Sequence, residues 1–281
     1  MGKAERRKAA ICGLVIALAA GGAIRAQQNG AQLLLPGPGP KPAFEVATIK
    51  PSRDTGATNY GVAEGRFNAD NATVADLIRL AYDVKSDNQL ENAPDWTNSR
   101  QFDVNAKIAD ADAVALEKLQ PTERFDQYRM MVQALLADRF KLKVSTREKV
   151  LPVNAMVVAK NGSKLTATAP DKQHLPWMWG GSRGELHAAS VSMDMFAGWL
   201  SGKADEGGRV VVNKTGLNGV YDFTLKWTPM GRASAESNAS GEAAAPSLLT
   251  ALDEQLGLQL QPGKAPVEVL VIDHVEQPTP N

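Results

Sequence analysis

One short motif of the chain has the spacing of a catalytic serine. Residues 180–184 read Gly-Gly-Ser-Arg-Gly, which fits the G-x-S-x-G pattern that places a nucleophile, here Ser182, on a strained turn between a strand and a helix. An acid and a base, Asp222 and His274, follow in the order used by such hydrolases. A strand is expected after the motif, however, over residues 185–190. The pattern therefore favours a glycine-rich hairpin turn, and a secreted serine-type hydrolase stays as an alternative.

The three histidines and the single cysteine offer little material for metal chemistry. His187 and His274 each alternate with apolar neighbours, as histidines on the solvated side of a strand do, and His174 falls in an expected loop. No pair has a metal-ligand spacing such as H-x-x-x-H, and one cysteine cannot form an internal disulfide or a cysteine-based zinc site. The segment Thr-Gly-Leu-Asn-Gly at 215–219 predicts a turn. The sequence thus predicts no metal and no cofactor.

The five tryptophans fall into two groups. Trp96, Trp199 and Trp227 occupy positions that predict burial in the core. Trp177 and Trp179 lie in an expected loop and would point the same way if the segment is extended. Such a pair could stack on a sugar or grip an apolar peptide. The interpretation favoured here is that both rings pack in the interface between two structural units.

Composition places the chain among ordinary folded proteins. It has 281 residues, of which 43% are hydrophobic and 22% charged, with 31 basic and 31 acidic side chains. This length suffices for one large domain or two domains of roughly 120 residues each, with a real core in either case. Because the basic residues form no cluster, nucleic-acid binding is not expected.

Residues 1–26 have the pattern of a secretory signal peptide. A basic segment, Met1–Lys8, precedes the uncharged segment Ala9–Ile24, which is shorter than a transmembrane span of about 20 residues. Cleavage is expected after Ala23 or Ala26, and an uncleaved membrane anchor is the alternative. Removal of the segment would leave 26 basic and 30 acidic side chains, a net charge of −4 and no cysteine. The expected location is periplasmic or extracellular.

The next stretch, residues 27–42, contains an alternating Pro-Gly run that cannot pair as a central strand or continue a helix. It is interpreted as a linker, and the folded body is expected to start near Ala43. A second stretch without apolar periodicity, residues 229–246, predicts a flexible loop.

The body reads as one unit written twice. Alternating apolar residues predict strands, and apolar residues at helical spacing predict helices. In the first unit the expected strands are 44–50, 66–71, 101–108, 140–144 and 153–159, and the expected helices are 73–82 and 122–138. In the second unit the expected strands are 164–169, 185–190, 220–227, 258–260 and 267–275, and the expected helices are 192–200 and 247–255.

A shift of 119 positions aligns the two units. It matches Pro51 with Pro170 and Gly65 with Gly184, and it also pairs two aspartates, Asp103 and Asp222. The sequence therefore predicts an α+β protein of two similar β-β-α-β-α-β-β units, residues 43–160 and 161–281. Each unit is expected to be a small, mostly antiparallel sheet with helices on one face.

Strand edges are a further candidate binding surface. The alternating segment 267–275 would expose backbone donors and acceptors to a partner's strand if it lies at an edge. Its charges Glu268 and Asp273, with Glu276 beyond it, would then serve either the partner or protection of that edge.

Several long blocks of the chain resemble a family of uncharacterised exported proteins of soil bacteria. The blocks are residues 66–84, 131–165, 211–229 and 246–281, so the resemblance covers nearly the whole chain after the linker. Some members of that family carry the domain fused to a BlaR-type membrane metallopeptidase. No catalytic residue is established for the family, so the resemblance implies none here.

A looser likeness concerns the order of elements in the second unit. The helix SMDMFAGWL, the short strand RVVVN and the segment TGLNGVYDFTL look like the short N-terminal domain of secretins and TonB-dependent transducers. That domain is a periplasmic interaction module without enzymatic activity. The function expected from the sequence is therefore an exported, non-catalytic binding, interaction or sensing module, whose partner is an envelope protein or a small ligand.

Overall fold

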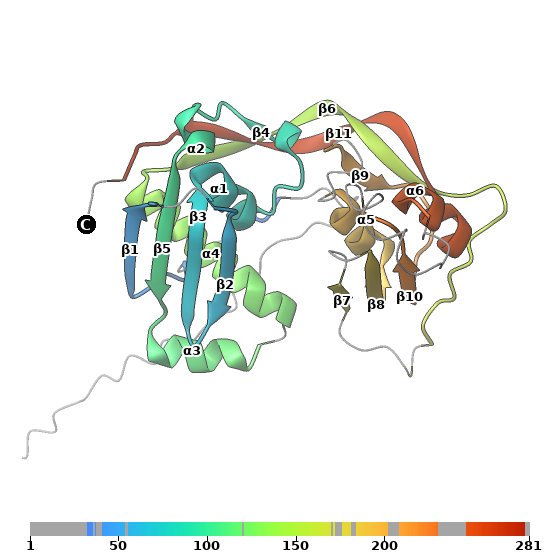
Figure 1. Cartoon of the computed structure of the whole chain (residues 1–281), viewed down its shortest axis with the longest axis horizontal. Helices are drawn as coiled ribbons and strands as arrows, with labels where there is room; N and C mark the ends of the chain where they lie inside the picture. The colour runs from blue at the N-terminus through green and yellow to red at the C-terminus, as the bar shows by residue number, and fades with distance from the viewer. Residues whose placement is uncertain are drawn as a thin grey trace, which may run out of the picture.

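The computed structural model describes residues 33–35, 37, 41–53, 56–119, 121–169, 171, 176–180, 184–201, 208–229 and 246–278. They form two lobes, each with a small antiparallel sheet and helices, and a long ribbon of two strands runs across both (Figure 1). The expected α+β class with small, mostly antiparallel sheets is confirmed. No helix among the described residues is long and apolar enough to cross a membrane.

The first lobe has a four-stranded antiparallel sheet in the order β1-β5-β3-β2. Side chains alternate along its strands, so Phe67, Ala69 and Val104 are buried on the side that faces the helices. Helix α1 starts with a capping box, in which Thr73 and Asp76 exchange hydrogen bonds with each other's backbone N–H. The elements are β1 (Val46–Pro51), β2 (Asn59–Ala63), β3 (Arg66–Thr73), α1 (Val74–Tyr82), η1 (Asp87–Gln89), α2 (Trp96–Ser99), β5 (Gln101–Lys107), α3 (Asp110–Glu117) and α4 (Pro121–Arg139).

The second lobe has a three-stranded antiparallel sheet in the order β10-β8-β7. Its core contains Leu186 and Leu225 from the sheet together with Phe196 and Leu200 from α5. The expected strand at 164–169 is reduced to one bridge, between Ala167 and Tyr221. The elements are β7 (Trp177–Gly180), β8 (Glu185–Ser192), α5 (Met193–Ser201), β10 (Val220–Lys226), α6 (Leu248–Ala251) and a π-helical turn, η4 (Leu252–Leu256).

The ribbon consists of β6 (Lys143–Val158) and β11 (Leu258–His274), which pair antiparallel along their length. Each replaces two separate strands expected from the sequence. The expected breaks fell at proline-containing stretches, and proline is tolerated where one side of a strand has no neighbour. Two short strands complete this sheet: β4 (Leu90–Glu91) lies parallel to β11, and β9 (Val210–Asn213) lies parallel to β6.

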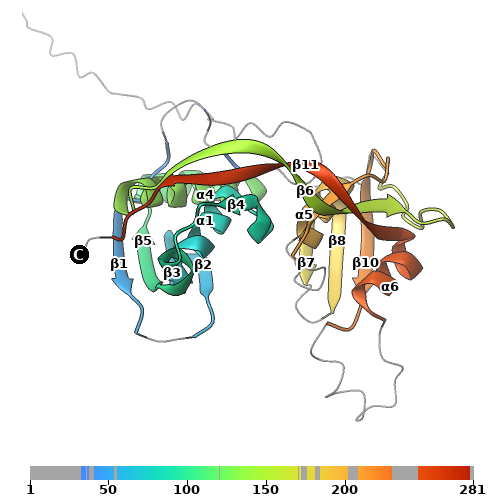
Figure 2. The ribbon, with the colours of Figure 1, turned by 90° about the horizontal axis from the view of Figure 1, so that it is seen from above.

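The ribbon exchanges strands between the lobes. β6 starts in the first lobe and ends in the second, where Met156 joins the core, and β11 runs the opposite way (Figure 2). Leu270 and Ile272 of β11 are buried in the first lobe, in the cluster that contains Phe102 and Leu142. The division expected at residue 160 therefore does not separate the lobes. The segment 267–275 is also not a free edge at its centre, because β4 covers Leu270 and the next residue.

The offset of 119 residues reappears in the element bounds. Strands β3 and β8, helices α1 and α5, and strands β5 and β10 each start and end 119 residues apart. Asn71 and Ser190 both have a positive φ, +52° and +51°. Their backbone N–H groups donate to Asp103 (3.0 Å) and Asp222 (2.7 Å). Common descent of the two units stays a prediction that these equivalences support.

Part of the expected linker belongs to the folded body. Leu33 and Leu34 are buried, with exposed fractions of 4% and 1%. The backbone of Leu34 donates to the carbonyl of Tyr82 (2.8 Å) and accepts from the amide of Gln133 (2.9 Å). The body thus begins before Ala43. The expected signal segment 1–26 and residues 230–245 of the expected loop lie outside the described residues.

Candidate functional site

The acid and the base of the candidate hydrolase site, Asp222 and His274, are not brought together. Ser182 lies outside the described residues. Asp222 sits on β10 in the second lobe, where its carboxylate accepts the backbone N–H of Ser190. His274 ends β11 at the first lobe, opposite Lys143. Because Asp222 and His274 belong to different lobes, they cannot serve one serine as its acid and base.

Trp177 and Trp179 lie on a strand and are exposed. They belong to β7, which pairs with β8, and their exposed fractions are 48% and 69%. The expectation that both rings pack between two units is therefore wrong. A strand turns alternate side chains to opposite faces, so the two rings share the outer face and are spaced by roughly 7 Å along the chain. Met178 between them packs against the core of the second lobe.

Polar side chains adjoin the two rings across the outer face of the sheet. The ring of His187 lies 5.5 Å from the ring of Trp179, centroid to centroid, at an angle of 32°. Its Nδ1 lies 3.3 Å from Oγ1 of Thr224, and its Nε2 lies 3.3 Å from a carboxylate oxygen of Glu185. Glu185 also accepts from Lys226 at 3.0 Å. We call this surface the tryptophan face: Trp177, Trp179, Glu185, His187, Thr224 and Lys226.

Charge on the tryptophan face is paired. The hydrogen bond from Lys226 holds the pKa of Glu185 below its ordinary value, against a smaller opposing effect of desolvation. The positive charge of Lys226 acts in the same direction as its hydrogen bond. Glu185 is therefore ionised at neutral pH and offers a hydrogen-bond acceptor beside the rings, while Lys226 offers a donor.

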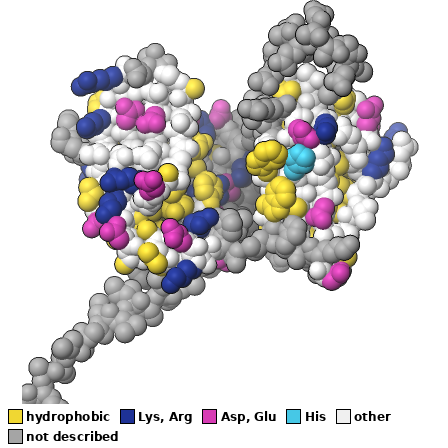
Figure 3. All heavy atoms as spheres, turned by 60° about the horizontal axis from the view of Figure 1, so that its bottom comes forward, with side chains coloured by type: hydrophobic (Ala, Val, Ile, Leu, Met, Phe, Trp, Pro, Cys, Tyr) yellow, Lys and Arg dark blue, Asp and Glu magenta, His cyan; other side chains and the backbone are white. Residues whose placement is uncertain are grey.

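The fold holds the tryptophan face in place from behind. Leu186 and Ala188 of β8 point to the opposite side of the sheet and are buried in the core. At the end of β7, Gly180 has φ +98°, and a Cβ there would lie 2.3 Å from the carbonyl oxygen of Glu185. Only glycine fits this close approach. Figure 3 shows hydrophobic side chains beside a histidine, with acidic and basic groups around them, on the surface of this lobe.

The remaining candidates have structural positions. Trp227 is buried in the core as expected, whereas Trp96 and Trp199 are half-buried and pack against the two cores. The expected turn at 215–219 has Gly216 at φ +70°. Among the described residues, no group of three histidine, cysteine or acidic side chains lies close enough to hold a metal ion.

Sequence reasoning missed a concave region in the first lobe. A hollow of about 680 Å³ lies between β2 and helices α1 and α4, and a smaller one of about 210 Å³ also borders β2. Tyr60 and Phe125, which line the larger hollow, are 48% and 43% exposed. The sequence Asn-Tyr-Gly-Val-Ala of β2 is a short alternating segment, and this was the available signal.

Comparison with known proteins identifies a family but no activity. The model of a family described as "Protein of unknown function (DUF3738)" matches residues 75–275. No match was found among the curated proteins compared, and none among the solved structures. Function must therefore be argued from the molecule itself.

Proposed function

The chain belongs to the DUF3738 family of proteins of unknown function, and from this premise we propose that it is an exported, non-catalytic binding protein that holds a saccharide on its tryptophan face. The observation that carries the proposal is the pair of exposed rings, Trp177 and Trp179, on one side of β7. Exposed aromatic groups in a cluster are typical of binding surfaces rather than of inert ones.

A sugar fits the chemistry of this face better than an apolar peptide does. A pyranose ring has an apolar face of C–H groups that can stack on an aromatic ring, and hydroxyl groups at its rim. His187, Thr224 and the Glu185–Lys226 pair lie where they can exchange hydrogen bonds with those hydroxyls. An apolar partner would instead desolvate these polar groups without replacing their hydrogen bonds to water, which is costly.

Intrinsic fluorescence tests this proposal directly, since the proposed ligand contacts two tryptophans. The purified protein would be titrated with β-1,4-linked oligomers of glucose and of N-acetylglucosamine. We expect a saturable change in emission, and a binding constant about tenfold weaker in either Trp177→Ala or Trp179→Ala. Leu249→Ala, at an equally exposed apolar residue on α6, is the matched control and should bind normally. An absence of saturable binding across both series would refute the saccharide proposal.

Export and the lack of catalysis need tests of their own. The basic and apolar pattern of residues 1–26 supports export, and the mass of the protein recovered from the periplasm should place its N-terminus at Ile24 or Gln27. Stoichiometric labelling of Ser182 by a fluorophosphonate probe would overturn the non-catalytic part of the proposal and favour the hydrolase alternative.

A further inference from the structure

The strand β2 is an open edge of the first sheet. It pairs with β3 on one side, and no other described strand pairs with it on the other. Ala63 and Arg66 flank the two-residue turn that joins the strands, so in such a hairpin they form a hydrogen-bonded pair, as do Gly61 and Asn68. The backbone groups of the alternate residues, Tyr60 and Val62, must then point away from β3, toward the free edge.

The composition of β2 leaves this edge unprotected. Proteins normally guard an exposed edge with lysine, proline or a bulge. The five residues of β2, Asn59 to Ala63, contain no charge and no proline. The opposite edge of the same sheet, β1, carries both Lys50 and Pro51.

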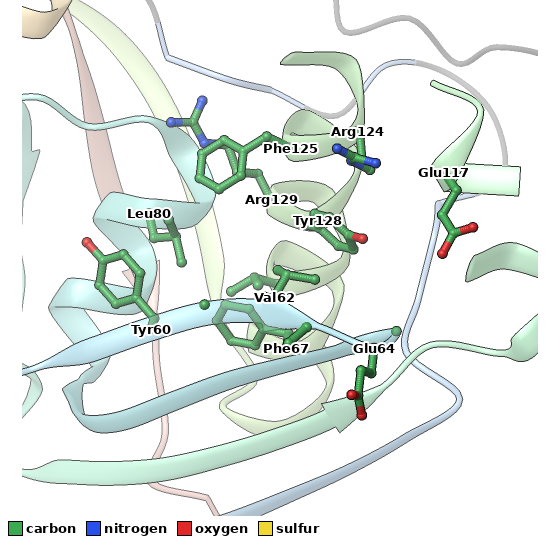
Figure 4. A pocket seen from close by; sticks show the side chains of 14 residues that line it. Tyr60, Val62, Glu64, Phe67, Leu80, Glu117, Arg124, Phe125, Tyr128 and Arg129 are labelled. Carbon is green, nitrogen blue, oxygen red and sulfur yellow. The ribbon is translucent and has the colours of Figure 1, made fainter. Parts of the chain in front are cut away.

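A hollow borders β2 on each face of the sheet. On the helix side, Tyr60 and Val62 meet Phe125 and Tyr128 of α4 around the hollow of about 680 Å³ (Figure 4). Helix α4, which lines this hollow, reaches past β2 on the open side of the sheet (Figure 1). A strand added to β2 would place every second side chain there.

The hollow on the other face has a different chemistry. It holds about 210 Å³ beside Gly61, whose missing side chain leaves open space, since a Cβ there would meet nothing within 4 Å. Asn59, Asn68 and Asp70 line it. Asp70 is exposed and, among the described residues, forms no ion pair, so this side favours a basic or polar side chain.

We propose that the free edge of β2 binds an extended peptide segment with alternating apolar and basic side chains, which joins the sheet as an added strand. Backbone hydrogen bonds to Tyr60 and Val62 provide affinity, and the two hollows select the alternating side chains. Apolar groups enter the hollow under α4, and basic groups face Asp70. This site is separate from the tryptophan face, which lies on the other lobe, and it does not depend on saccharide binding.

The test uses an acetylated octapeptide of alternating valine and lysine, with a fluorescent label, and measures anisotropy on the full chain. Two peptides serve as controls: the same sequence with an N-methyl group on every residue, which leaves no backbone donor on either edge, and a block sequence of four valines followed by four lysines. We expect the alternating peptide alone to bind. Equal binding of the block peptide would show that composition and charge suffice and would overturn strand addition.

Hydrogen exchange provides a residue-specific signature. The amide protons of Tyr60 and Val62 should exchange slowly only in the presence of the alternating peptide, because an added strand accepts their hydrogen bonds. Those of Gly61 and Ala63, which already bond to β3, should change little. Unchanged exchange at Tyr60 and Val62 under saturating peptide would overturn the proposal.

Two substitutions complete the test. Gly61→Leu fills the smaller hollow without a backbone clash and should weaken binding of the alternating peptide at least about fivefold. Asp70→Asn should weaken it about twofold to fivefold and reduce its salt dependence. Asp112→Asn, at an exposed acid on α3, is the matched control. If the Gly61→Leu and Asp70→Asn variants both bind the alternating peptide like the unmodified protein, the smaller hollow is not part of a peptide site and the proposal fails.

Discussion

Truncation of Leu270 to alanine tests the exchange of strands between the lobes. Leu270 is fully buried in the core of the first lobe, although it lies about 180 residues along the chain from its parallel neighbour Leu90. Removing its side chain leaves a cavity among residues such as Phe102, and we expect a loss of about 3 kcal/mol in the free energy of unfolding. For a chain of this size, that corresponds to a decrease in Tm of roughly 6–12 °C.

The assay combines guanidinium unfolding with amide hydrogen exchange. In Leu270→Ala, exchange should accelerate first in the first lobe, in β5 and α1, because the cavity lies there. Leu258→Ala is the matched variant. Leu258 is equally buried at the other end of β11, but in the core of the second lobe, so amide hydrogen exchange should accelerate in the second lobe. If Leu270→Ala costs less than about 1 kcal/mol, or loosens only the second lobe, the exchanged arrangement is wrong.

Three further predictions concern the framework. Burial raises the pKa of Tyr82 to about 12, so the stability of the fold is complete below pH 10, and about 2–3 kcal/mol of the free energy of unfolding is lost as pH rises from 10 through 12. Tyr82→Phe should remove this loss when unfolding curves are compared at pH 9 and pH 12. Gln133→Leu removes two hydrogen bonds, to the carbonyls of Leu34 and Ala81, and should lower the free energy of unfolding by about 1–3 kcal/mol. The segment around Leu34 should also be cleaved faster by proteases. Unchanged proteolysis would contradict the anchoring role of Gln133. Asp103→Ala and Asp222→Ala each leave a backbone N–H without its carboxylate acceptor and should each cost about 1–3 kcal/mol by denaturant unfolding; a loss at one position only would argue against their equivalence.

Local patterns predicted much of the fold. The capping residue Thr73 and the apolar spacing behind it predicted α1, and β8 and β10 were recognisable from alternation alone. β6 and β11 were each divided in two, because proline normally ends a strand that has neighbours on both sides, and the absence of such neighbours is a tertiary property. The parallel pairing of β4 with β11 joins segments too distant in the chain for any local pattern to reveal.

The candidate binding residues were predictable in type but not in exposure. Trp177 and Trp179 stood out in the sequence, but whether an aromatic ring faces core or solvent depends on which side of a strand it occupies. Because β7 was expected to be a loop, the alternation of side chains along a strand could not be used to predict which way the two rings face. Tyr60 and Phe125 line one hollow although they come from different elements, and only the packing of α4 beside β2 brings them together.

The strands that run through both lobes also determine when each lobe can finish folding. Residues of the first lobe pack against β11, the last strand that the structure describes. Neither lobe can close its core before β11 is available, so a growing chain would stay incompletely folded until residues 258–274 have been made. Long sequence separation between contacting residues also slows folding. A chain that must cross a membrane unfolded would gain from this delay, because its first half cannot fold stably on its own before transport.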